Sequence, residues 1–251
     1  MTWLKSRRLQ YLLAITALFF SLMVVLRVVF YFGFSEIPSS TTADSEAVLS
    51  ALGIGLRFDL RLALLIMLPL AALAYLPRFN ILNSGLMRFL AHSYLIIVLV
   101  LLGLTYVLDF GHYAYLGERL NVTALRFLQD TRDSTLMVWE SYPVIWITLG
   151  LIAGVAVCYW LARIAEHKLL QRPATKISWL QATAGFLVCF TLFFFAILGR
   201  VSNINILNPI PLRWSEAFVS GDRAIGALGL NPVLYFRDTL VIPVSPFDED
   251  K

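Results

Sequence analysis

The sequence predicts an all-α integral membrane protein: a bundle of about five transmembrane helices with further helices at the external membrane surface. Two observations predict this class. The 251 residues are 59% hydrophobic and only 14% charged, with a mean hydropathy of +0.77, whereas about a quarter of the residues in a soluble domain are charged. The apolar residues also form long blocks, and a bilayer core requires roughly 20 residues of helix.

Four of these blocks are uncharged over a length that could cross a bilayer. Residues 9–26 form the first block, and residues 89–108, 142–162 and 178–199 form the third, fourth and fifth. Each is too long and too apolar for a helix buried in a soluble protein. Each block therefore predicts one transmembrane helix.

The second predicted segment is shorter and carries charge. Its uncharged part, residues 62–76, would be about 22 Å long at 1.5 Å per residue, which is too short to span. We therefore expect the helix to draw residues 55–61 (GLRFDLR) into the outer membrane boundary. Pro69 is expected to kink it, which a membrane helix tolerates when its neighbours satisfy the freed carbonyl.

The basic residues of the short loops predict the orientation, because cytoplasmic loops are enriched in Lys and Arg. One side carries Lys5, Arg7, Arg8, Arg78, Arg88, Arg163, Lys168, Arg172 and Lys176. On the other side, residues 35–46 have no basic residue and residues 109–141 have only Arg119, Arg126 and Arg132. We expect a bacterial cytoplasmic (inner) membrane protein with a cytoplasmic N-terminus and an extracytoplasmic C-terminus. The basic residues indicate contacts to anionic lipid, not to nucleic acid.

Two external regions have a mixed apolar and charged pattern at helical spacing. Residues 212–229 predict a short amphipathic helix on the membrane surface, and residues 116–139 predict either such a helix or a packed loop. The expected organisation is a five-helix transmembrane domain over residues 1–199. An external amphipathic segment follows over residues 200–251.

The charges expected within the membrane are the candidate functional residues, because ionisable groups at that depth usually have a partner or a task. Arg57 and Arg61 are four residues apart and share a helix face, and two guanidinium groups on one face suit the oxygens of a lipid phosphate. Asp59 points elsewhere, and Arg27 is its candidate partner in a structural ion pair. The alternative for the whole triplet is an ion-paired anchor that only fixes helix packing.

The remaining polar residues do not form a recognisable catalytic or metal site. Asp109 and His112 are three residues apart on one helix face, but no third or fourth metal ligand follows at convincing spacing. Cys158 and Cys189 both lie in apolar blocks and are expected to be packed thiols. The sequence thus predicts no catalytic residue and no metal ligand.

Four stretches resemble one known family. They are GIGLRFDLRLALLIMLP (53–69), LDFGHYAYLGERLNVTALRFLQD (108–130), WESYP (139–143) and PLRWSEAFVSGDRAIGALGLNPVLYF (211–236). Together they are similar to the membrane half of the lipoteichoic acid synthase-like proteins, which include bacterial phosphoglycerol transferases. The most specific marks are Arg-Phe-Asp-Leu at the start of the second segment and Asn-Pro-x-x-x-Phe near the end.

This resemblance implies a five-helix domain followed by an extracytoplasmic sulfatase-like domain of the alkaline phosphatase superfamily. That domain would carry a Thr nucleophile and a divalent metal, commonly manganese, and would take glycerol phosphate from phosphatidylglycerol. The sequence stops at Lys251, a few residues after the point where such a domain would begin. No catalytic or metal-binding residue of the family can therefore be assigned. The chain is then expected to be a shortened product or a relative without the catalytic half.

The resemblance implies a membrane anchor that presents a lipid substrate, with a catalytic domain as a possible partner in trans. One alternative is a non-catalytic membrane protein that binds lipid or a partner through its outer helices. A small transporter ranks last, because transporters usually have inverted repeats or broken helix pairs at the midplane and only Pro69 fits that pattern.

Overall fold

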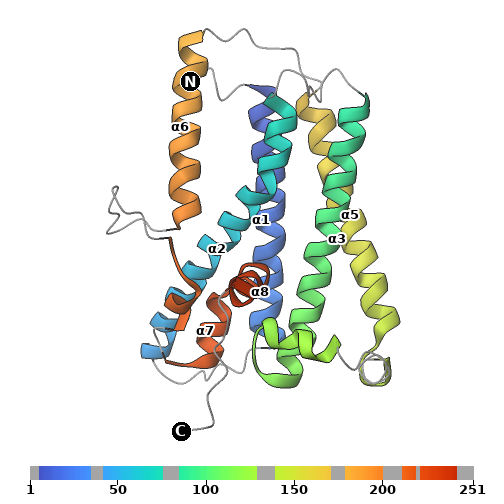
Figure 1. The fold of residues 1–251 in the computed structure, drawn as a ribbon, viewed down its shortest axis with the longest axis vertical. Coiled ribbons are helices and arrows are strands. Elements are labelled where there is room, and N and C mark those ends of the chain that lie inside the picture. The colour runs from blue at the N-terminus through green and yellow to red at the C-terminus, as the bar shows by residue number, and fades with distance from the viewer. Residues whose placement is uncertain are drawn as a thin grey trace.

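The computed structural model describes residues 6–34, 42–75, 85–128, 139–170, 179–199, 211–218 and 221–241, and every regular element in these ranges is a helix. Long helices run along the length of the molecule (Figure 1). They are α1 (Arg7–Gly33), α2 (Thr42–Tyr75), α3 (Gly85–Leu116), α5 (Val144–Leu170) and α6 (Trp179–Leu198).

The short helices gather at one end of the bundle (Figure 1). They are η2 (Val122–Leu128), η3 (Trp214–Phe218), α7 (Arg223–Gly229) and α8 (Pro232–Val241). We call η3, α7 and α8 the platform, and the end of the bundle that they cover the platform end. The opposite end, where α1 and α3 begin and α5 ends, is called the basic end.

Three of the long helices, α1, α3 and α5, are long and apolar enough to cross a membrane. Large apolar side chains on their outer surfaces are exposed, among them Phe32, Leu101, Trp146 and Trp160. A soluble monomer rarely exposes so much contiguous apolar surface. The prediction of an all-helical membrane protein is therefore confirmed. The count of about five crossings is not, since it also requires α2, which carries charge, and α6.

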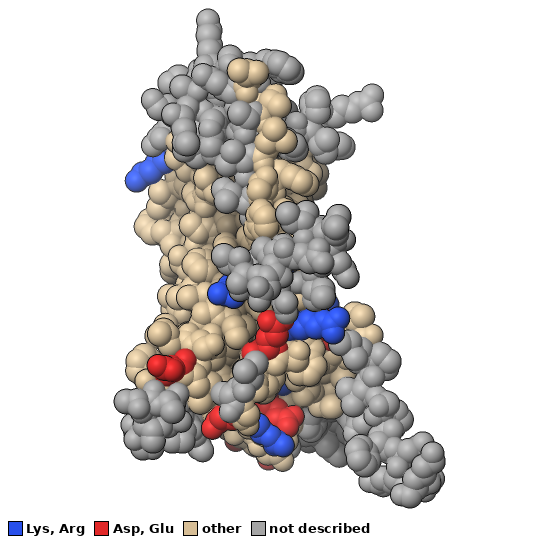
Figure 2. Space-filling view, turned by 90° about the vertical axis from the view of Figure 1, so that its left-hand side faces the viewer, with Lys and Arg blue, Asp and Glu red and all other residues tan. Residues whose placement is uncertain are grey.

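The core lies where α1 packs against α2 and α5, and where α3 packs against α5. Ile15 and Phe19 of α1, Leu70 of α2 and Leu95 of α3 are almost completely buried there. Helix α6 contacts α2 and stands at the side of the bundle (Figure 1). Figure 2 looks onto that side. The described residues in this view are mostly uncharged, and most of their visible charged side chains lie in the lower part, toward the platform end.

Helix α2 continues through Pro69. Tyr94 of α3 donates a hydrogen bond of 2.8 Å to the carbonyl of Ile66, three residues before the proline. The carbonyl that Pro69 leaves without a helical donor is that of Leu65, four residues before it. The Tyr94 bond is made to the next carbonyl along the helix and ties α3 to α2 beside the proline.

The two regions that the sequence predicts to be external differ in detail from the helices predicted there. Over 212–229 there are two short helices, η3 and α7, in place of one. The second starts afresh because Gly221 has a φ of +73° and the Asp222 side chain accepts hydrogen bonds from the backbone N–H groups of Ala224 and Ile225. Within 116–139, α3 ends before Gly117, which has a φ of +68°, and the short helix η2 follows.

Candidate functional site

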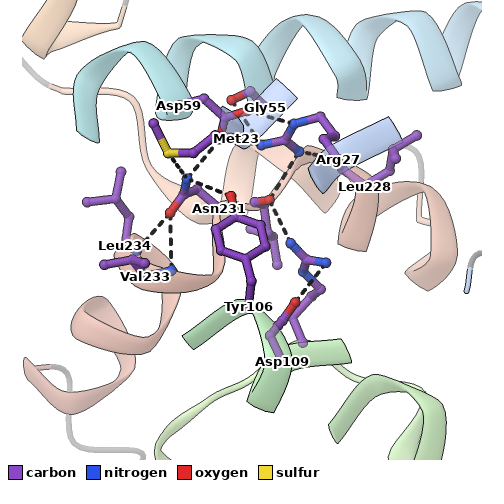
Figure 3. Close-up of polar contacts among 12 residues, drawn as sticks. Met23, Arg27, Gly55, Asp59, Tyr106, Asp109, Leu228, Asn231, Val233 and Leu234 are labelled. Carbon is purple, nitrogen blue, oxygen red and sulfur yellow. Dashed lines mark hydrogen bonds and ion pairs between the residues drawn. The ribbon is translucent and has the colours of Figure 1, made fainter. Parts of the chain in front are cut away.

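The structure brings together Arg27 of α1 and Asp59 of α2, the pair that the sequence suggested, at the platform end (Figure 3). Nε of Arg27 donates to Oδ2 of Asp59 at 2.9 Å, and Nη2 donates to Oδ1 at 2.7 Å. The two side chains are only 4% and 0% exposed. This two-point geometry is the strong form of an arginine–carboxylate contact.

The rest of the Arg27 guanidinium binds backbone carbonyls. Nη2 donates to Gly55 at 3.1 Å, and Nη1 donates to Leu230 at 3.1 Å and to Leu228. All five N–H donors of the arginine are thereby used. Carbonyls near the C-terminal end of a helix such as α7 lack partners within that helix. Arg27 therefore fastens α7 to α1 and α2.

Asn231 connects the same carboxylate to α8 (Figure 3). Its Nδ2 donates to Oδ1 of Asp59 at 2.8 Å. Its Oδ1 accepts hydrogen bonds from the backbone N–H groups of Val233 and Leu234 at 3.1 and 3.2 Å, so that it caps the N-terminus of α8. Pro232 occupies the first helical position, where its missing N–H is harmless. The Asn-Pro pair in the sequence is thus a helix start that also holds Asp59.

A second buried ion pair lies beside the first. Nη1 of Arg119 is 3.0 Å from Oδ2 of Asp109, and these side chains are 3% and 0% exposed. The Asp109 carboxylate also accepts the backbone N–H of Leu120 at 2.9 Å. The Arg119 guanidinium lies over the ring of Phe30, 4.1 Å from its centre, as in cation–π contacts. It donates to the Leu230 carbonyl at 3.3 Å.

Burial lowers the pKa of Arg119, and the attraction of the Asp109 carboxylate opposes that shift. An arginine nevertheless keeps its proton in proteins. The spacing of Asp109 and His112 raised the question of a metal site, but in the structure Asp109 pairs with Arg119. Nδ1 of His112 lies 2.8 Å from the carbonyl of Glu118. In the part of the chain that the structure describes, no three His, Cys, Asp or Glu residues are grouped to hold a metal ion.

We refer to Arg27, Asp59, Asp109, Arg119 and Asn231 as the ion-pair cluster. Its two cations and two carboxylates balance, and both arginines donate to the carbonyl of Leu230. Breaking a buried ion pair by removing one partner typically costs about 3–5 kcal/mol, because the remaining charge is left without compensation. The cluster therefore joins the platform firmly to α1, α2 and α3. Its charged side chains already bind one another.

The structure places the two other candidate residues differently. Arg57 is exposed on α2. Arg61 is buried, and its Nη1 and Nη2 donate to the carbonyls of Leu212 and Leu198 at 3.1 and 2.9 Å. Leu198 is the last residue of α6, so Arg61 ties the end of that helix to α2 and to the start of the platform. Arg57 is thus the member of the pair that is open to a ligand.

Close packing of Gly55 against Arg27 gives a direct test of the cluster. A β-carbon at position 55 would overlap the Arg27 guanidinium and lie 2.9 Å from its Nε, whereas a β-carbon at Gly53 would have nothing within 4 Å. We expect Gly55→Ala to lower the free energy of unfolding by about 1–3 kcal/mol, as overpacking does. Gly53→Ala is the matched control, and its better helix propensity should leave stability unchanged or raise it by up to about 1 kcal/mol. Thermal unfolding in one detergent compares them, and equal melting temperatures would contradict the Arg27 geometry.

Comparisons with protein-family models, with curated proteins and with solved structures found no match. The family resemblance noted in the sequence therefore stays a prediction.

Proposed function

We propose that this chain is a membrane anchor that holds a fixed platform at the outer surface of the bacterial cytoplasmic membrane and presents lipid head groups there. The observation that carries the proposal is the ion-pair cluster. Two buried pairs, Arg27–Asp59 and Arg119–Asp109, join the platform to three helices of the bundle. Such pairs are costly to break, so the platform keeps one orientation relative to the membrane. A lipid-processing partner needs such a fixed orientation.

The proposed topology has five crossings, with α2 and α6 in addition to α1, α3 and α5. Helix α6 has 20 residues, which at 1.5 Å per residue is about the 30 Å of a bilayer core. The charges of α2 at Asp59 and Arg61 are buried and bonded, which removes the main objection to its crossing. The basic end would face the cytoplasm, because nine Lys and Arg residues lie in its short loops and helix ends, whereas residues 35–46 carry none and residues 109–141 carry three.

The proposed lipid is phosphatidylglycerol, and the proposed partner is a sulfatase-like catalytic domain that transfers glycerol phosphate. Both follow from the resemblance to the lipoteichoic acid synthase-like proteins. In this proposal the chain is not catalytic alone, and manganese would belong to the catalytic domain. The chain would anchor the reaction at the membrane and supply the lipid.

Arg57 is the proposed contact for the lipid phosphate. It is exposed on α2 and lies beside exposed Leu56, so a cation and an apolar side chain face outward together. Arg61, the other candidate from the sequence, has both terminal nitrogens engaged with carbonyls. The geometry therefore supports Arg57 better than Arg61. A guanidinium on this surface could donate two hydrogen bonds to one phosphate.

The test is lipid retention measured by native mass spectrometry after reconstitution with equal amounts of phosphatidylglycerol and phosphatidylcholine. Arg57→Gln should lower the affinity for one bound phosphatidylglycerol about fivefold, so that complexes with one lipid fewer predominate, with little change in melting temperature. Arg61→Gln should instead lower the melting temperature, because it leaves the Leu198 and Leu212 carbonyls without their donor. Arg223→Gln is the control, since this arginine of α7 is 86% exposed and should change neither. Unchanged phosphatidylglycerol retention in Arg57→Gln would refute the proposed site.

A non-catalytic protein that binds a protein partner through the platform is the second candidate. The exposed apolar residues Leu240 and Val241 at the end of α8 favour it. The same lipid experiment separates the two candidates, because a purely protein-binding role predicts no preference for phosphatidylglycerol over phosphatidylcholine.

A further inference from the structure

At the basic end, one carboxylate is surrounded by cations from two helices. Nη1 of Arg163 lies 3.0 Å from Oε2 of Glu166 on the same helix, α5. From α3, Nε of Arg88 lies 3.8 Å from Oε1 of Glu166, and Nε2 of His92 lies 3.2 Å from Oε2. Nη1 of Arg163 also lies 2.8 Å from Nε2 of His92. This basic-end cluster therefore links α3 to α5.

The charges in this cluster do not balance, in contrast to the ion-pair cluster at the other end. Arg88 and Arg163 carry two positive charges, and Glu166 supplies one negative charge. The arginine side chains are 50% and 39% exposed, whereas Glu166 is 11% exposed. The positive charge is therefore turned outward, and the carboxylate lies beneath it. An anion that approached from outside would meet two guanidinium groups that share a single carboxylate.

The depth of the cluster matches that of lipid phosphates. Arg88 directly precedes the uncharged block 89–108, and Arg163 directly follows the uncharged block 142–162. Both guanidinium groups thus lie where an apolar span meets the head-group region. Exposed Trp160, three residues before Arg163, is of the residue type that is enriched at this interface. Arg7 of α1 adds a further cation nearby, because it donates to the carbonyl of Leu170 at the end of α5.

We propose that Arg88 and Arg163 form a binding site for the phosphodiester head group of an anionic phospholipid, between α3 and α5 at the basic end. Basic pockets between helices on the cytoplasmic side of membrane proteins bind such head groups. The planar guanidinium group suits the phosphodiester, because it can donate two parallel hydrogen bonds to one pair of oxygens. This site lies at the opposite end of the bundle from Arg57, and it does not depend on the proposed function.

The experiment uses the full chain in nanodiscs with equal amounts of phosphatidylglycerol and phosphatidylcholine, followed by native mass spectrometry. Arg88→Gln and Arg163→Gln should each lower the affinity for one bound phosphatidylglycerol about fivefold, a lipid other than the one that Arg57→Gln removes, and should leave retained phosphatidylcholine unchanged. Arg223→Gln at the platform end is the control and should match the wild type. Arg88→Gln is the safer variant for folding. Arg88 is half exposed, and its 3.8 Å contact with Glu166 is longer than those of His92 and Arg163.

Replacement of the carboxylate separates a lipid site from a purely structural ion pair. Glu166→Gln releases both arginines, so the proposal expects retained phosphatidylglycerol to rise, even if the melting temperature falls. A structural ion pair alone would lower retention in step with stability in all three variants, and that result would overturn the site. Equal phosphatidylglycerol retention in Arg88→Gln, Arg163→Gln and the wild type would also overturn it. So would displacement of the lipid by millimolar inorganic phosphate, which would indicate a site for the free ion.

Discussion

Asp59→Asn is expected to lower the free energy of unfolding by about 3–5 kcal/mol, because it leaves the Arg27 guanidinium buried without a counter-charge. Asp59 is the centre of the ion-pair cluster, since it accepts hydrogen bonds from Arg27 and from Asn231. The variant should therefore also loosen the start of α8. Thermal unfolding in a single detergent, monitored by circular dichroism, measures the loss.

Two further variants are compared with Asp59→Asn. Asp238→Asn removes a carboxylate whose partner, Arg237, is 58% exposed, and surface pairs contribute only about 0–1 kcal/mol. The double variant Arg27→Met with Asp59→Leu should lose less stability than the sum of its single variants, because no charge is then left buried alone. A loss for Asp59→Asn no greater than that for Asp238→Asn would contradict the buried pair.

Arg119→Met is expected to have an effect of similar size, about 3–5 kcal/mol, because Asp109 would be left fully buried and unpaired. The contact with the ring of Phe30 and the hydrogen bond to Leu230 are lost with it. Since Leu230 connects α7 to α8, the platform should loosen before the bundle does. Hydrogen exchange of the backbone amides should become faster in α7 and α8 than in α1.

Arg119→Lys is the matched control for this variant. A lysine keeps the charge but not the two-pronged geometry, so its effect should fall between those of the wild type and Arg119→Met. If the backbone amides of α7 and α8 exchange in Arg119→Met at the same rates as in the wild type, the platform does not depend on this pair.

The spans α1, α3 and α5 could be predicted from sequence because a bilayer imposes both a minimum length and an apolar composition. The pairing of Arg27 with Asp59 could be suggested for a related reason, since a charge within a span needs a partner. Each of these inferences uses information that is local in the chain or confined to a few charged residues. The number of crossings beyond three stays a prediction, because charge in α2 breaks the compositional signal.

The rest of the candidate site depends on contacts between residues far apart in sequence. Asn231 and Asp59 are 172 residues apart, and no local pattern joins them, although Asn before Pro does signal a helix start. Helical spacing placed Arg57 and Arg61 on one face of α2, but it could not show that the end of α6 covers Arg61 and leaves Arg57 exposed. The role of Arg119 was also missed, because it follows α3 in a segment between predicted spans, where a charged residue needs no buried partner.

In the proposed topology, the platform lies on the outer face of the membrane and the basic end lies on the inner face. Single cysteines at two exposed positions test this most directly, after replacement of Cys158 and Cys189 by alanine: Val241→Cys in the platform and Lys168→Cys at the basic end. A membrane-impermeant thiol reagent added to intact cells should label position 241 and should reach position 168 only after the cells are lysed. Labelling of position 168 in intact cells, with position 241 protected, would reverse the topology and contradict the proposed presentation of lipid at the outer surface.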